Sequence, residues 1–106
     1  MVDSGLIRSK LEELYSFYKE VEKNSKEGWD LEKSQFGGKE AAVMIQLIDQ
    51  SKGDLKNKDL KRLHAGFGNL THGIERFMDH NFEEKHREVI KGIYYIKQDL
   101  EKYIKW

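Results

Sequence analysis

The sequence contains no cysteine and no proline. Without cysteine the chain can form no disulfide and offers no thiolate, a composition typical of proteins in the reducing cytoplasm. Without proline, no predicted helix is interrupted from within by that residue. No apolar run approaches the ~18 residues that a membrane span needs, and residues 1–9 lack the basic and apolar regions of a signal peptide. We therefore expect a cytoplasmic protein that does not cross a membrane.

The sequence also lacks an excess of charge of either sign. Nineteen Lys and Arg residues balance nineteen Asp and Glu residues, so the formal net charge is zero although 36% of the residues are charged. Because proteins that bind nucleic acids present a clustered positive excess, we expect no nucleic-acid partner. The 106 residues suffice for one domain, and 38% hydrophobic residues supply its core, so residues 1–106 are predicted to form a single domain.

The clearest helical pattern lies in residues 57–79. Its apolar residues recur at steps of three and four: Leu60, Leu63, Phe67, Leu70, Ile74 and Phe77. This spacing aligns the side chains along one side of an α-helix. Gly66, Gly68 and Gly73 each cost about 1 kcal/mol relative to Ala inside a helix. Since the apolar series keeps its phase across them, we predict one continuous helix in which Gly66 and Gly73 admit a neighbouring backbone. The alternative is a break between Gly66 and Gly68.

The same periodicity predicts three further helices. The first is capped by Asp3 or Ser4 and ends near Asn24. The second covers residues 39–52 and is apolar on nearly every side, so we expect it to be the most buried. The last begins with a capping-box pattern and covers residues 82–106. Four such helices predict an all-α fold, an antiparallel four-helix bundle.

The predicted connection between the first and second helices, residues 25–38, is long for a compact domain. It contains Trp29 and Phe36, which a purely flexible linker would not retain. One interpretation is that these side chains cover an end of the bundle. The other is that the connection binds a partner, since Trp is common among the residues that dominate binding energy at interfaces.

Further aromatic residues face outward in the register of the last predicted helix, namely Tyr94, Tyr95 and Trp106. Exposed aromatic side chains at several places are typical of interfaces. We therefore predict a small non-catalytic protein that acts through contact with a partner protein or with a second copy of itself, as a homodimer. The predicted contact residues are Trp29, Phe36, Tyr94, Tyr95 and Trp106.

The four histidines offer the main alternative chemistry: His64, His72, His80 and His86. A di-metal bundle needs Glu-x-x-His pairs on two helices, and only Glu83 with His86 forms one. Bundles of the HEPN type, which include RNA-cleaving proteins, space Arg and His more widely than the three residues between Arg76 and His80, so the resemblance stops at helical architecture. We expect no cofactor and assign no catalytic or metal-binding residue. A His- and Arg-dependent nuclease and a metal-binding bundle stay as alternatives.

Overall fold

The computed structural model describes residues 2–24, 28–77 and 84–106; within these ranges, the side chains of residues 29, 30, 72–77, 84–86, 89 and 90 lie outside the description. Over these residues the chain forms four helices and no strand. The helices are α1 (Ser4–Asn24), α2 (Trp29–Ser51), α3 (Asn57–Phe77) and α4 (Glu84–Tyr103). The prediction of an all-α chain is therefore confirmed.

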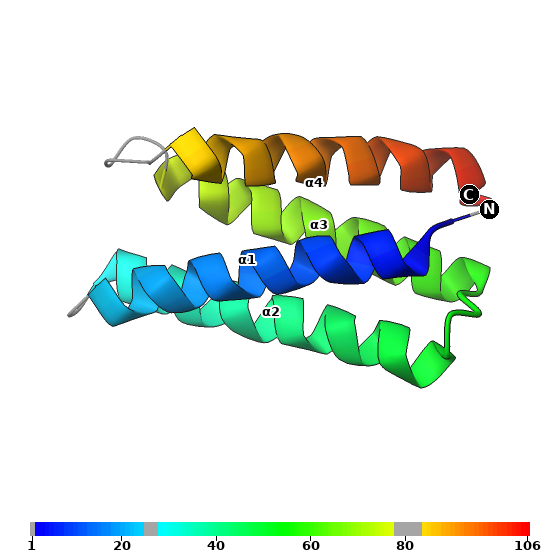
Figure 1. The fold of residues 1–106 in the computed structure, drawn as a ribbon, viewed down its shortest axis with the longest axis horizontal. Helices are drawn as coiled ribbons and strands as arrows, with labels where there is room; N and C mark the ends of the chain where they lie inside the picture. Colours follow the sequence, from blue (N-terminus) through cyan, green and yellow to red (C-terminus); the bar gives the residue numbers. More distant parts are fainter. Residues whose placement is uncertain (1, 25–27, 78–83) are drawn as a thin grey trace.

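Successive helices run in opposite directions, and their axes lie side by side along the longest dimension of the molecule (Figure 1). Helix α1 packs against α2 and α4, and α3 packs against the same two helices. The contact is most extensive between α1 and α2 and least extensive between α1 and α4. The core lies where the four apolar faces meet. Its fully buried side chains come from all four helices: Leu11, Leu14, Met44, Leu63, Phe67, Leu70 and Ile93.

Helix α3 follows the sequence pattern closely. It is continuous across its three glycines, so the alternative of a break between Gly66 and Gly68 is wrong. A side chain of α2 lies close to Gly66: a Cβ placed on this glycine would lie only 2.5 Å from the sulfur of Met44. Gly66 thus admits the side chain of Met44, where we predicted a neighbouring backbone. The surroundings of Gly73 lie outside the described residues.

Helix α2 differs from the prediction, because it begins at Trp29 and not at Lys39. The predicted long connection over residues 25–38 is therefore wrong from residue 29 onward. Gly37 and Gly38 lie inside the helix and are buried.

Small residues explain both why α2 begins as early as Trp29 and why the apolar pattern did not predict this beginning. The buried side of this part of α2 is formed by small residues three or four apart: Ser34, Gly37, Gly38 and Ala41. A Cβ on Gly37 would overlap the ring of Tyr18 on α1. The helical period of this segment is thus carried by small side chains that let α1 approach, and an apolar pattern does not detect it.

Side chains hold the beginning of α1 and the segment that follows α4. Asp3 caps α1, since its Oδ1 accepts a hydrogen bond from the backbone N–H of Leu6 at 3.0 Å. Helix α4 ends at Tyr103, three residues before the predicted end. The segment after α4 is bound by the amide of Asn57, whose Nδ2 donates to the carbonyl of Lys105 at 2.9 Å and whose Oδ1 accepts from the N–H of Lys105 at 2.8 Å. The capping pattern predicted at Asn81 lies outside the described residues.

Candidate functional site

The five predicted contact residues do not form one surface. Phe36 lies on α2, Tyr94 and Tyr95 lie on α4, and Trp106 follows α4. These four side chains are exposed, from 41% at Tyr94 to 74% at Trp106. The side chain of Trp29, at the start of α2, lies outside the described residues. The structure thus separates the predicted set into a site on α2, a site on α4 and a site after α4.

Trp106 lies against α3. Its ring meets the ring of His64 edge-on, with 5.2 Å between the centroids, and His64 Nε2 lies 2.8 Å from Glu101 Oε1. The imidazole of His64 thus lies between a carboxylate of α4 and the indole that follows α4. In the described part of the chain, no group of three or more His, Asp or Glu side chains could hold a metal ion. Since His64 belongs to α3 and Glu101 to α4, the contact joins these two helices.

The other histidines bear on the two alternative functions. The side chains of His72 and His86 and of Arg76 lie outside the described residues, as does His80. The nuclease and metal-binding alternatives therefore stay untested predictions.

Tyr95 borders a groove that runs between α1 and α4. A narrow part of about 160 Å³ lies between the beginning of α1 and the end of α4, where Tyr103 lines it. A wider part of about 530 Å³ continues along the two helices past Tyr95. Three residues line both parts, which makes the groove continuous: Leu6, Ile96 and Asp99.

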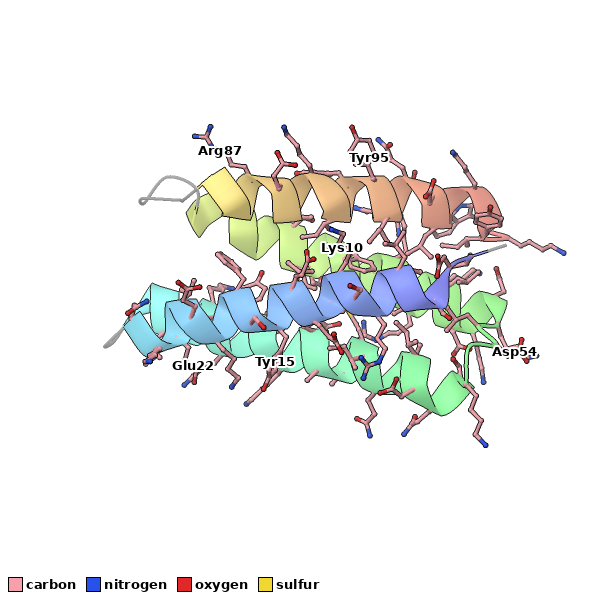
Figure 2. The ribbon with its side chains drawn as sticks, viewed as in Figure 1. Lys10, Tyr15, Glu22, Asp54, Arg87 and Tyr95 are labelled. Carbon is pink, nitrogen blue, oxygen red and sulfur yellow. The ribbon has the colours of Figure 1, made fainter. Side chains whose placement is uncertain are left out.

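A glycine and a lysine keep the groove open. Lys10 on α1 and Tyr95 on α4 lie on its two sides (Figure 2). A Cβ placed on Gly92 of α4 would lie 3.4 Å from both Cδ and Cε of Lys10, so the lysine stem lies across the glycine. Over this stretch, α1 and α4 meet where the methylene groups of Lys10 pack on the backbone of Gly92. No large side chain that the structure describes fills the space above the core there.

The floor of the groove is apolar and its edges carry large exposed side chains. Ile96 and Leu100 form the floor as buried core residues. Leu6, Tyr95 and Tyr103 rise at the edges with 50%, 68% and 46% of their surface exposed. Apolar side chains exposed at this level around an apolar floor are typical of a protein interaction site.

The charges around the groove are balanced in sign. Three lysines and three acidic residues line it: Lys10, Lys91, Lys102, Asp3, Glu88 and Asp99. On α4, Lys91 pairs with Glu88 and Lys102 pairs with Asp99, each at 3.6 Å within the helix. Exposed ion pairs of this length contribute little to stability. These lysine and acidic side chains can therefore form ion pairs with a bound molecule in place of those with each other.

Two edge residues, Leu6 and Tyr103, were not among the predicted contact residues. The available signal for Leu6 was its position beside, and not within, the buried series of α1 that contains Ile7, Leu11 and Leu14. Tyr103 fits the apolar series of its own helix and carried no such signal. Its exposure depends on where α4 ends, which periodicity does not determine.

Comparisons of the chain with protein-family models, with curated proteins and with solved structures find no match. Functional arguments therefore rest on the geometry of the molecule itself. Along the residues that the structure describes, none of the helices combines the length and the apolar character required to cross a membrane.

Proposed function

We propose that the protein is a non-catalytic antiparallel four-helix bundle that acts by contact with another protein. We further propose that the groove between α1 and α4 receives an amphipathic helix of that partner. The observation that carries the proposal is the apolar floor of this groove with Leu6, Tyr95 and Tyr103 exposed at its edges. Helices commonly bind in such grooves by burying an apolar face. The absence of cysteine is the ground for placing this contact in the cytoplasm.

The bundle assignment is supported by the order of contacts. Each helix packs against two others, and the direction alternates from one helix to the next (Figure 1). Short connections between antiparallel neighbours are typical of such bundles. A fifth helix laid between α1 and α4 would extend the same packing.

The length of the groove suits a helical segment. On α4 its lining runs from Glu88 to Tyr103. At a rise of 1.5 Å per residue this is a length of about 22 Å, which corresponds to a bound helix of about 15 residues. Such a helix can place four apolar residues over Ile96 and Leu100, at steps of three and four.

The charges define the polar side of the partner. With three positive and three negative side chains along the groove, a strongly acidic or strongly basic helix would meet as many like charges as opposite ones. Like charges placed together suppress binding of the wrong partner. The proposed partner helix therefore carries Lys and Glu in similar numbers beside its apolar face.

The test uses a synthetic peptide of that chemistry, about 15 residues long, with leucines on one face and alternating Glu and Lys on the other. We expect its addition to ¹⁵N-labelled protein to shift the amide NMR signals of the groove residues Leu6, Gly92, Tyr95 and Tyr103. Tyr95→Glu places a charge at the apolar edge and should weaken binding at least about tenfold, equivalent to about 1.4 kcal/mol. Tyr94→Glu, one residue away and outside the groove lining, is the matched control and should bind like the wild type.

Several results would contradict the proposal. Peptide-induced shifts that map to another surface, equal binding by the Tyr95→Glu variant, or no shift at millimolar peptide would each do so. Signals of the groove that change with protein concentration before any peptide is added would show that a second copy occupies it instead.

A further inference from the structure

The floor of the groove between α1 and α4 is lowest at Gly92. Three residues of α4, at steps of four, form this floor: Gly92, Ile96 and Leu100. Residues at this spacing follow one another along the same side of a helix. Ile96 and Leu100 fill their places with buried side chains, whereas Gly92 has no side chain and is itself only half-buried. The floor therefore drops at Gly92 by the height of a side chain.

The end of the Lys10 side chain occupies this low part of the floor. A Cβ placed on Gly92 would lie 3.4 Å from Lys10 Cδ, 3.4 Å from Lys10 Cε and 3.7 Å from Lys10 Nζ, and these are the three atoms nearest to it. Lys10 projects from α1 toward α4, opposite Tyr95 (Figure 2). The space that a side chain of α4 would fill is thus taken by a side chain of α1.

Lys10 is held in this position only weakly. Its amine lies 3.4 Å from Glu13 Oε2 on the same helix, and the two side chains are 30% and 45% exposed. Exposed ion pairs of this kind contribute little to stability. A lysine side chain is also long and flexible, and it can keep its amine in water in several arrangements. Little free energy therefore opposes a movement of Lys10 away from Gly92.

We propose that Gly92 is the specificity-determining position of the groove: it receives the bulkiest apolar side chain of the bound helix, and that side chain displaces the end of Lys10. This inference rests on the proposed function, because it names the place within the groove that selects the partner. The selected partner carries Leu, Met or Phe at this one position. At the positions over Ile96 and Leu100 it carries smaller apolar residues or leucines.

The depth available to the bound helix explains this choice of position. Over Ile96 and Leu100, an apolar side chain of the partner rests on the end of another side chain. Over Gly92 it can reach the backbone of α4 and still contact the exposed ring of Tyr95, three residues further on. Because each additional atom pair at contact distance adds attraction, a bulky side chain gains most at Gly92. The displaced amine of Lys10 then faces the polar side of the bound helix, where a Glu can pair with it.

Gly92→Ala tests the inference because it should change stability and binding in opposite directions. The added methyl group lies at contact distance from flexible methylene groups of Lys10, and Ala favours a helix more than Gly does. We therefore expect the urea midpoint of unfolding to rise. The same methyl group raises the low part of the floor, so the leucine-bearing peptide that tests the groove should bind at least about fivefold more weakly.

Gly68→Ala is the matched control. Gly68 also lies within a helix, and the atom nearest to a Cβ placed there is again the end of a lysine, Lys97 Nζ at 3.5 Å. It belongs to α3, however, and does not line either part of the groove. This variant should gain stability as Gly92→Ala does, while it binds the peptide like the wild type.

A set of peptides identifies the side chain that Gly92 receives. Each peptide has one leucine replaced by alanine, and its affinity is measured for the wild type and for Gly92→Ala. One of these replacements should cost the wild type about tenfold in affinity and cost Gly92→Ala several-fold less, since contacting residues show such coupling in a double-mutant cycle. Lys10→Ala should bind the unmodified peptide more tightly than the wild type, because no side chain then has to leave the low part of the floor.

The outcomes separate this inference from the proposed function. The inference would be overturned by equal affinity of the wild type and Gly92→Ala, by a lower stability of Gly92→Ala, by weaker binding of Lys10→Ala, or by the absence of coupling for every leucine. If the peptide still shifts the signals of the groove in such a case, the proposed function stands. A peptide that does not bind in the groove of the wild type would overturn both.

Discussion

Two neighbouring glycines of α2 have different surroundings, which makes opposite effects of the same substitution a residue-scale prediction. A Cβ on Gly37 would overlap the ring of Tyr18, which is 1% exposed and has no space to move. Overpacking of this kind costs about 1–3 kcal/mol. Ala improves on Gly by about 1 kcal/mol in helix propensity, which is too little to offset that cost. We expect Gly37→Ala to lower the free energy of unfolding, measured by urea denaturation.

Gly38→Ala is the matched control. The atoms nearest to a Cβ there are Lys19 Cε at 3.8 Å and Tyr18 Cβ at 3.9 Å, both at ordinary contact distance. The helix-propensity gain then remains, and the variant should be more stable than the wild type by up to about 1 kcal/mol. If Gly37→Ala were as stable as Gly38→Ala, the close packing of α1 on Gly37 would be refuted.

At the scale of the elements, apolar periodicity located α1 and α3 because each helix buries one continuous apolar series. It missed residues 29–38 of α2, where Ser34 and Gly37 are buried and no large side chain marks the period. The outward direction of Tyr95 also followed from periodicity. The groove beside Tyr95 could not be predicted in this way, because it depends on Lys10 of α1 lying across Gly92 of α4. The apolar spacing within a helix does not show which residues of a distant helix will pack against it.

The segment after α4 is held to α3 by the amide of Asn57, and this element-scale contact can be removed alone. Asn57→Ala eliminates both hydrogen bonds to Lys105. Each bond of this kind contributes about 0.5–1.5 kcal/mol, with the lower value expected at an exposed site. We expect the backbone amide of Lys105 to exchange with deuterium several-fold faster in this variant, as measured by NMR.

Asn57→Asp is the control for that experiment. It keeps an oxygen that accepts from the Lys105 N–H but loses the donor to the Lys105 carbonyl, so protection of this amide should be largely retained. An unchanged exchange rate in Asn57→Ala would mean that other contacts, such as the packing of Trp106 on His64, hold the segment.

At the scale of the whole molecule, three helices meet at one side chain. Tyr18 projects from α1, its ring packs on Gly37 of α2, and its hydroxyl donates to the carbonyl of Leu70 on α3 at 2.9 Å. Burial raises the pKa of Tyr18 well above its ordinary value of about 10. In the unfolded chain the same hydroxyl loses its proton near pH 10, while the folded protein retains it.

The sign of the resulting pH dependence follows from proton binding. Above about pH 10 the unfolded state holds one proton fewer at this site than the folded state, so the free energy of unfolding falls as the pH rises. One group contributes a slope of about 1.4 kcal/mol per pH unit. Urea denaturation between about pH 8 and 11 should show this decline in the wild type. Tyr18→Phe, less stable at pH 8, should lack that part of the slope, whereas Tyr95→Phe should keep it. Equal slopes for the wild type and Tyr18→Phe would mean that this hydroxyl is accessible to solvent and does not join the three helices.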